Sequence, residues 1–291
     1  MAERFSRESM RLGGLLTAMV TPFDADGALH EEATVRLIHH LLENGSDGLV
    51  LAGSTGEGAT MTDEEKLRLW ELGVAESGDA PIIAGTGTYD TRHSVELTER
   101  AHETGVDAML VVTPYYVRPN RRGIRAHYEA VAAATDRPIV AYNIPSRTGT
   151  DMPNDLLAEL AEIENVAAVK QARYEDIAPV EGMDLLAGND DVFAEVMDMG
   201  GTGIISVAGN LVGSEMRRII DEPERRQEIQ DGLRDLFAAL TVTVNPIPVK
   251  TALNMAGHDV GPLRLPLVEA SEEERAVIRE ALERHNLLAA V

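Results

Sequence analysis

The chain has 291 residues, and 44% of them are hydrophobic, which is enough to build a sizeable core. Lys and Arg total 26 against 49 Asp and Glu, so the formal net charge is −23 and the sequence pI is near 4.7. Such a surface repels phosphate groups, so we expect neither nucleic acid nor an anionic membrane as a partner. The sequence has no cysteine, which excludes disulfides, thiolate catalysis and cysteine metal sites.

Lysine is nearly absent. Lys66, Lys170 and Lys250 are the only three, so the other 23 basic residues (26 minus 3) are arginines. An acidic, lysine-poor composition is typical of proteins from salt-loving archaea, in which counter-ions screen the self-repulsion. The shortage of lysine disfavours the alternative of an ordinary acidic cytosolic protein. The first ten residues contain no apolar export signal, and no apolar run approaches membrane-spanning length, so we expect a soluble cytoplasmic protein.

Short apolar runs recur along most of the chain and predict eight strands. They lie at 15–20, 48–52, 81–84, 108–112, 138–144, 166–170, 185–187 and 203–207. Several are continuously apolar, as in parallel strands that are buried on both faces. Helical patterns alternate with them, among them 31–44, 91–104, 153–163 and a helix that Thr62 and Glu65 open as a capping box. This alternation predicts an α/β fold, a (β/α)8 barrel over residues 1–222.

The strand rhythm stops after residue 222. Helical patterns follow at 223–244, 248–256 and 271–287. We therefore expect residues 223–291 to form a C-terminal extension of about three helices.

Lys170 ends the apolar run 166–169, where a lysine is costly to bury. A buried amine is either neutral or in use, and a neutral amine at a strand end is a nucleophile suited to form a Schiff base with a carbonyl substrate. Judged by position alone, a lysine that merely emerges from the strand into solvent fits the sequence equally well. Lys250 is the weaker rival, because the two prolines near it predict a turn before a tail helix. Lys66 is expected to be solvated on a charged helix face.

Other strand ends in a barrel of this type would face the same cavity. The loop 53–58 after strand 2 is rich in glycine and small hydroxyls, and its N–H groups suit a carboxylate, although many such loops are only turns. Tyr116 follows strand 4, and Tyr142 belongs to strand 5. A buried tyrosine is most often a core aromatic, but two tyrosine-bearing ends beside a lysine favour catalysis.

Several motifs fall in order at these strand ends. They are Gly-Ser-Thr-Gly-Glu (53–57), Thr-Pro-Tyr-Tyr (113–116), Tyr-Asn-Ile-Pro-Ser-Arg-Thr-Gly (142–149), the strand ending in Lys170, Gly-Ile-Ile-Ser-Val (203–207) and Asn-Pro-Ile-Pro-Val-Lys (245–250). Together they resemble the dihydrodipicolinate synthase and N-acetylneuraminate lyase family of pyruvate-dependent class I aldolases. The resemblance covers nearly the whole chain, and segments 146–149 and 245–250 look most like the dihydrodipicolinate synthase branch.

The resemblance implies a role for each matching residue. Lys170 would form the imine with pyruvate, and Tyr142 would shuttle protons beside it. Thr55 would link Tyr142 to Tyr116, which would reach in from a neighbouring subunit. The resemblance thus implies at least a dimer, and a homotetramer arranged as a dimer of dimers.

The substrate contacts are implied in the same way. Ser54 and Thr55 would hold the pyruvate carboxylate, and the Arg147 fork would pair with a carboxylate on the incoming aldehyde. The backbone of Gly188 and Ile205 would complete the pocket. The enamine formed from pyruvate would attack L-aspartate 4-semialdehyde to give 4-hydroxy-tetrahydrodipicolinate, on the route to diaminopimelate and lysine. No cofactor is implied, and the scattered histidines form no metal-ligand pattern.

Two departures from the family pattern leave the aldehyde open. Gln171 follows the imine lysine where a glutamate is common, and Ser54 stands where threonine is more usual. The alternative is an aldolase for a 2-keto-3-deoxy-sugar acid such as 2-keto-3-deoxygluconate, which Arg147 disfavours because a sugar aldehyde has no carboxylate there. A non-catalytic keto-acid sensor is disfavoured by the intact set of reactive side chains.

Lysine inhibits some members of this family through polar groups near strands 2 and 3, including an acidic residue that binds its ammonium. Tyr115 matches that site. Asp63 and Lys66 replace histidines, Gly58 offers no side chain, and His93 stands where the acidic residue would be. We therefore expect lysine to inhibit weakly or not at all.

Overall fold

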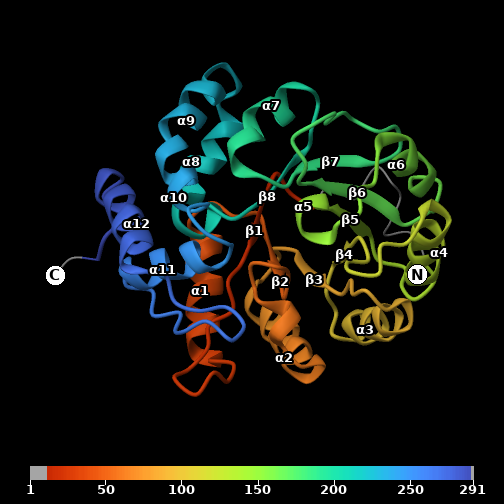
Figure 1. The fold of residues 1–291 in the computed structure, drawn as a ribbon, viewed down its shortest axis with the longest axis horizontal. Helices are drawn as coiled ribbons and strands as arrows, with labels where there is room; N and C mark the ends of the chain where they lie inside the picture. Colours follow the sequence, from red (N-terminus) through yellow and green to blue (C-terminus); the bar gives the residue numbers. More distant parts are fainter. Residues whose placement is uncertain (1–11, 290–291) are drawn as a thin grey trace.

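The computed structural model describes residues 12–289 and contains a closed barrel of eight parallel strands that run in chain order (Figure 1). The strands are β1 (Leu15–Ala18), β2 (Gly48–Leu51), β3 (Ile82–Gly85), β4 (Ala108–Val112), β5 (Ile139–Asn143), β6 (Val166–Gln171), β7 (Asp184–Ala187) and β8 (Gly203–Ser206). All eight overlap the predicted strands, so the expected (β/α)8 fold is confirmed. The first ten residues, on which the absence of an export signal was argued, lie outside the described part of the chain.

Helices surround the barrel as an outer ring (Figure 1). They are α1 (Glu31–Glu43), α2 (Asp63–Glu76), α3 (Thr91–Glu103), α4 (Arg121–Ala132), α6 (Asn154–Leu160), α7 (Phe193–Asp198) and α8 (Gly209–Asp221), with short 3-10 turns at Gly58–Thr60 and Asp190–Val192. The single-turn helix α5 (Pro145–Thr148) lies inside this ring in the view of Figure 1. The capping box before α2 is present: Thr62 Oγ1 accepts from the Glu65 N–H, and Glu65 Oε2 accepts from the Thr62 N–H. Pro153 is the residue before α6 and not its first helical residue.

Side chains alternate between two layers along each strand. One set packs against the helices, and the other fills the barrel interior with Leu16, Val50, Leu110, Val140, Ala168 and Leu186. Lys170 lies two residues from Ala168 and so shares its inward face, in register with Tyr142 on β5. Gln171 points to the opposite face, where its Oε1 accepts from Asn143 Nδ2 at 3.0 Å. The departure from the family pattern at Gln171 is therefore outside the barrel interior.

The chain beyond α8 is helical and lies at one side of the barrel, in blue in Figure 1. It contains a 3-10 turn (Pro223–Arg225), α9 (Arg226–Gly232), α10 (Arg234–Ala239), α11 (Ile247–Met255) and α12 (Glu272–Arg284). The single helix expected over 223–244 is wrong. Gly232 ends α9, and the β-branched run 241–244 before Asn245-Pro246 does not continue α10.

The helices of this extension pack on α8 and on one another, and α9 and α11 both contact α8. The division into a barrel at 1–222 and an extension at 223–291 stays a prediction. Within residues 12–289, no helix is long and apolar enough to cross a membrane.

Candidate active site

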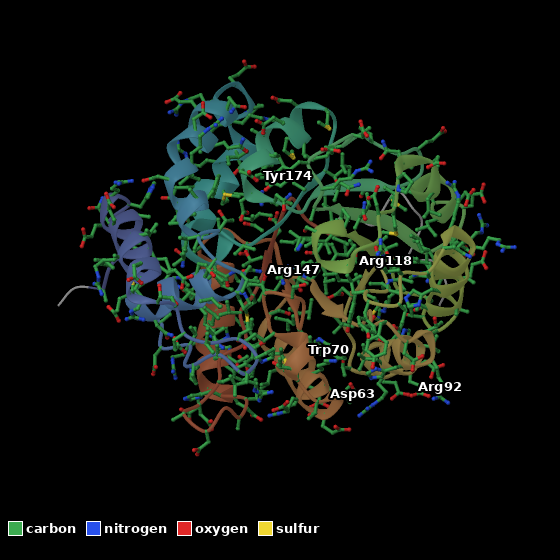
Figure 2. The ribbon with its side chains drawn as sticks, viewed as in Figure 1. Asp63, Trp70, Arg92, Arg118, Arg147 and Tyr174 are labelled. Atoms are coloured by element: carbon green, nitrogen blue, oxygen red, sulfur yellow. The ribbon has the colours of Figure 1, made fainter. Side chains whose placement is uncertain are left out.

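A cavity of about 610 Å³ opens at the carboxyl ends of the barrel strands. Its lining comes from the β2 loop, β5 and α5, β6, the β7 loop, β8 and the C-terminal extension. Six of the eight predicted site residues line it: Ser54, Thr55, Tyr142, Arg147, Lys170 and Gly188. Figure 2 labels two residues of the lining, Arg147 on α5 and Tyr174 in the segment after β6. The strand ends thus bring the predicted polar groups to one place.

Lys170 is 5% exposed yet lines this cavity. Its Nζ lies 4.4 Å from the centroid of the Tyr142 ring. No hydrogen bond or ion pair to Lys170 Nζ is formed within residues 12–289. A nearly buried amine that no protein carboxylate holds is available to react with a carbonyl group.

The loop after β2 presents Ser54 and Thr55 to the cavity through an unusual backbone path. Ala52 and Glu57 flank it with φ of 55° and 54°, in the left-handed region that side chains rarely adopt. A Cβ on Gly58 would lie 2.0 Å from the Ala52 carbonyl oxygen, so only glycine fits there. Strain of this kind persists only where the surroundings hold it, and it is common at binding sites.

Arg147 is exposed on α5, and its Nη2 donates to the Asn245 carbonyl oxygen at 2.8 Å. Asn245 belongs to the segment between α10 and α11, and its Nδ2 donates to Thr55 Oγ1 at 3.0 Å. The sequence reasoning assigned Asn245 to a family motif but gave it no role in the site. Arg147 also lines the cavity, and a guanidinium there is suited to bind a carboxylate.

Asp190 organises the ends of β7 and β8. Its carboxylate accepts from Ser206 Oγ at 2.5 Å and from the backbone N–H of Val207 and Ala208. Burial raises the pKa of Asp190, while these hydrogen bonds act in the opposite direction. Gly188 precedes it, and a Cβ there would lie 2.7 Å from the Ala172 Cβ, so the two strand ends can approach only with glycine.

The structure does not bring two predicted site residues into this cavity. Tyr116 is 88% exposed at the end of β4, with φ of 70°, and does not line it. Ile205 is fully buried in the barrel interior, and Val207 lines the cavity instead. Thr55 Oγ1 is bonded to Asn245, and no hydrogen bond joins it to Tyr142 within the described residues. The predicted proton relay is therefore not assembled in a single copy of the chain.

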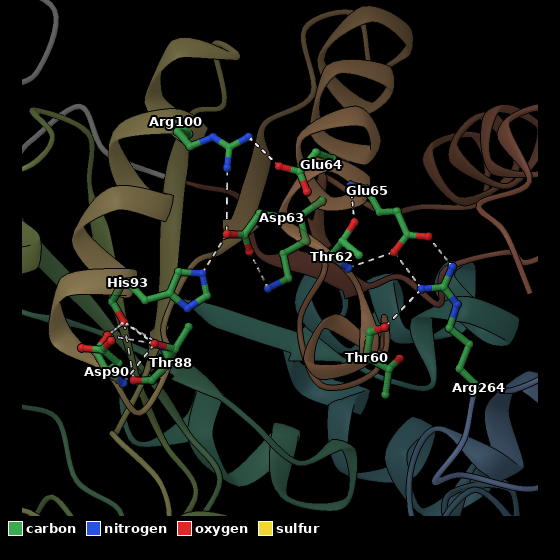
Figure 3. Close-up of polar contacts among 12 residues, drawn as sticks. Thr60, Thr62, Asp63, Glu64, Glu65, Thr88, Asp90, His93, Arg100 and Arg264 are labelled. Carbon is green, nitrogen blue, oxygen red and sulfur yellow. Dashed lines mark hydrogen bonds and ion pairs between the residues drawn. The ribbon is translucent and has the colours of Figure 1, made fainter.

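The other two lysines are both buried, which corrects the expectation that Lys66 is solvated. Lys66 is 7% exposed and lines a smaller cavity of about 110 Å³ with Tyr115. Its Nζ lies 3.7 Å from Asp63, which also pairs with His93 at 2.8 Å and with Arg100 at 3.9 Å (Figure 3). The apolar stem of Lys66 turns inward although α2 is otherwise highly charged. The periodicity of the helix did not reveal this direction.

Lys250 is 1% exposed on α11, where its Nζ lies 2.7 Å from Glu57 Oε1. It does not line the large cavity. Among the described residues, no group of three or more His, Asp and Glu side chains is placed to hold a metal ion.

Comparisons with known proteins agree with this architecture. Residues 11–285 match the model of the dihydrodipicolinate synthetase family. The 4-hydroxy-tetrahydrodipicolinate synthase of Moorella thermoacetica is 44% identical over 96% of this chain and 100% of its own length. That of Methanothrix thermoacetophila is 39% identical over 92% of this chain and 95% of its own.

Solved structures give the same answer. Dihydrodipicolinate synthase from Aquifex aeolicus has a TM-score of 0.91 and 38% identity, with 96% of this chain and 99% of that one covered. The enzyme from Acinetobacter baumannii, solved with pyruvate bound, has a TM-score of 0.91 and 34% identity, with 95% and 100% covered. This protein therefore belongs to the dihydrodipicolinate synthetase family.

Proposed function

We propose that this protein is a 4-hydroxy-tetrahydrodipicolinate synthase, which condenses pyruvate with L-aspartate 4-semialdehyde through a Schiff base. The observation that carries the proposal is Lys170, a nearly buried lysine in a cavity at the strand ends that has no ion-pair partner among the described residues. The relatives named 4-hydroxy-tetrahydrodipicolinate synthase support the reaction, and the pyruvate-bound Acinetobacter structure supports the first substrate.

The chemistry follows from the cavity groups. Lys170 Nζ attacks the pyruvate keto carbon, water leaves, and the resulting imine makes the pyruvate methyl group acidic. Loss of a methyl proton gives an enamine, whose carbon attacks the aldehyde. Tyr142, whose ring lies against Lys170 Nζ, would carry the protons. The amine of the added substrate then displaces Lys170 and closes the ring.

Two groups are assigned to the substrate carboxylates. Ser54 and Thr55 would bind that of pyruvate, with the backbone at Gly188 across the cavity. Arg147 would bind that of the aldehyde, since its guanidinium is fixed at one nitrogen only and is otherwise free. A 2-keto-3-deoxy-sugar acid remains the alternative substrate, and Arg147 is the residue that separates the two.

Assembly is the further part of the proposal. Tyr116 is exposed in the single chain, and so is the next residue, Val117, at 53%. Tyr89, at 55%, packs edge-on against the ring of Tyr115. An exposed aromatic of this kind fits an interface, so we propose that Tyr116 completes the site of a second copy in a tetramer built as a dimer of dimers. The proposed place of work is the cytoplasm, at high salt.

The experiment that tests the function supplies pyruvate with each aldehyde in turn and identifies the product by mass spectrometry. A product formed with aspartate semialdehyde, and none formed with the sugar aldehyde, supports the synthase assignment. Borohydride reduction with pyruvate alone should add one pyruvate-derived group to Lys170. A group found on Lys66 or Lys250 instead, or condensation with the sugar aldehyde only, would overturn the proposal.

A further inference from the structure

Asn245 joins the two halves of the cavity although it lies far along the chain, between α10 and α11. Its side-chain Nδ2 donates to Thr55 Oγ1 at 3.0 Å, on the side proposed to hold pyruvate. Its backbone oxygen accepts from Arg147 Nη2 at 2.8 Å, on the side proposed to hold the aldehyde. The same residue therefore contacts both substrate-binding groups, once through its side chain and once through its backbone.

The bond to Thr55 fixes the polarity of that hydroxyl. A threonine hydroxyl has one hydrogen to donate, and its oxygen accepts here from the amide. Thr55 is 3% exposed and lines the cavity, and within residues 12–289 its Oγ1 has no other hydrogen-bond partner. The hydroxyl hydrogen is thus left for a group inside the cavity, either a pyruvate carboxylate oxygen or the Tyr142 hydroxyl.

The side-chain carbonyl oxygen of Asn245 does not help to hold the fold. Its Oδ1 is buried and has no hydrogen-bond partner among the described residues. An unpaired buried acceptor destabilises the fold because its lost hydration is not replaced, and an apolar side chain at this position would avoid this cost. The amide is retained at a stability cost while it faces the cavity, which points to a role in the reaction.

We propose that Asn245 is a positioning residue, which holds Thr55 Oγ1 as an acceptor and so directs the Thr55 hydroxyl hydrogen toward bound pyruvate. This inference rests on the proposed function and adds to it the requirement for a specific hydroxyl orientation. Because Arg147 is held by the backbone of Asn245, a change of the Asn245 side chain acts on the pyruvate half alone.

The decisive variant is Asn245→Asp, which keeps the shape of the side chain but can only accept. Thr55 must then donate its hydrogen to the new carboxylate, away from pyruvate. We expect the rate of borohydride trapping of pyruvate to fall about tenfold, and the KM for pyruvate to rise to a similar degree, as for loss of one hydrogen bond. The KM for the aldehyde should change less than about twofold, because the contact to Arg147 is unchanged.

Comparison with Asn245→Ala separates orientation from packing. Alanine frees the Thr55 hydroxyl to rotate, so its effect should be smaller than that of aspartate, about threefold. A merely structural role predicts the opposite order, because aspartate preserves the shape and alanine does not. An alanine variant that traps pyruvate more slowly than the aspartate variant overturns the proposal.

The negative charge of Asn245→Asp also repels pyruvate, and a Thr55→Val background isolates this effect. Valine has no hydroxyl for Asn245 to orient. Adding Asn245→Asp to Thr55→Val should therefore slow trapping by less than about twofold relative to Thr55→Val alone. A full tenfold loss in that background assigns the effect to charge and overturns the proposal. If the aspartate variant does not fold, the same cycle with Asn245→Ala applies, and additive losses contradict the inference.

The matched control is Asn120→Asp, the same chemical change at the residue before α4, where it accepts from the Gly123 N–H outside the cavity. It should trap pyruvate at the wild-type rate; a loss equal to that of Asn245→Asp would show that the added charge acts at any site. If wild type traps pyruvate but makes no product from aspartate semialdehyde, the proposed function fails while the trapping results still decide on Asn245.

Discussion

The pair of Lys250 and Glu57 gives the sharpest test of what holds the substrate loop. Both side chains are buried, at 1% and 0% exposure, and Nζ lies 2.7 Å from Oε1. The Lys250 Nζ also lies 4.2 Å from the centroid of the Phe23 ring. The second carboxylate oxygen of Glu57 accepts from the Arg264 N–H at 2.9 Å. Burial lowers the pKa of Lys250, and Glu57 opposes this shift.

Replacing Lys250 by Met removes the ammonium but keeps most of the volume. The Glu57 carboxylate is then left buried with a single backbone donor. Breaking a buried pair in this way costs about 3–5 kcal/mol, because the remaining charge is uncompensated. Adding Glu57→Gln removes that charge while its amide oxygen can still accept from Arg264, so the double variant should recover most of the loss.

The assay is urea unfolding followed by circular dichroism, with trapping of pyruvate as a second readout. Lys66→Met is the matched control: Lys66 lies 3.7 Å from an Asp63 that keeps His93, so we expect a loss of under about 1 kcal/mol. If Lys250→Met destabilises no more than Lys66→Met, or if Glu57→Gln adds to the loss, the ion pair does not hold the loop.

Four further predictions follow from the charges of the chain. Arg147→Ala should lower kcat/KM for aspartate semialdehyde by roughly thirtyfold, about 2 kcal/mol, while Arg92→Ala on α3 leaves it unchanged; equal activity of the two variants would refute the assignment. L-Lysine should not inhibit at low concentration, because its ammonium would meet Lys66 and an Asp63 that is already paired; half-inhibition below about 1 mM contradicts this. The melting temperature should rise with KCl, since the screening length shortens from roughly 10 Å at 0.1 M to 3 Å at 1 M. A melting temperature that does not change with KCl would contradict this prediction. Burial lowers the pKa of His127 to about 4, so the folded state excludes a proton that the unfolded state binds below pH 6.5. Stability should therefore fall as the pH is lowered from 6.5 toward 4, by about 2 kcal/mol at pH 5, and His127→Gln should remove that part of the slope; equal slopes would contradict it.

The barrel and the position of polar groups at its strand ends were predictable because the apolar runs in the sequence coincide with the buried strands. Each apolar run contains a strand that is buried on both faces, so its position follows from the run of apolar residues, although its ends differ by up to two residues from those predicted. Lys170 could be found because a charge that ends a buried run conflicts with the run itself, and such conflicts mark functional sites. Tyr142 follows once β5 and β6 are neighbours in the barrel.

The contacts that complete the cavity could not be read in this way. Asn245 and Thr55 are 190 residues apart. Neither lies in a helix or strand, so no periodic pattern in the sequence shows where its side chain points. The inward turn of Lys66 depends on its rotamer, since a long aliphatic stem can bury itself on a helix that is polar by composition. The break between α9 and α10 was visible in Gly232, but a single glycine is often tolerated within a helix.

The C-terminal extension is therefore part of the active site in a physical sense. The backbone at Ala52 and Glu57 is strained, and strain persists only where neighbouring groups hold it. Those groups come from beyond residue 222: Lys250 and the Arg264 amide hold Glu57, and Asn245 holds Thr55. The predicted boundary at residue 222 therefore does not divide these contacts, because the loop after β2 is held by groups from beyond it. The barrel supplies Lys170, the proposed imine lysine, and the extension holds the hydroxyl of Thr55, which is proposed to bind the substrate.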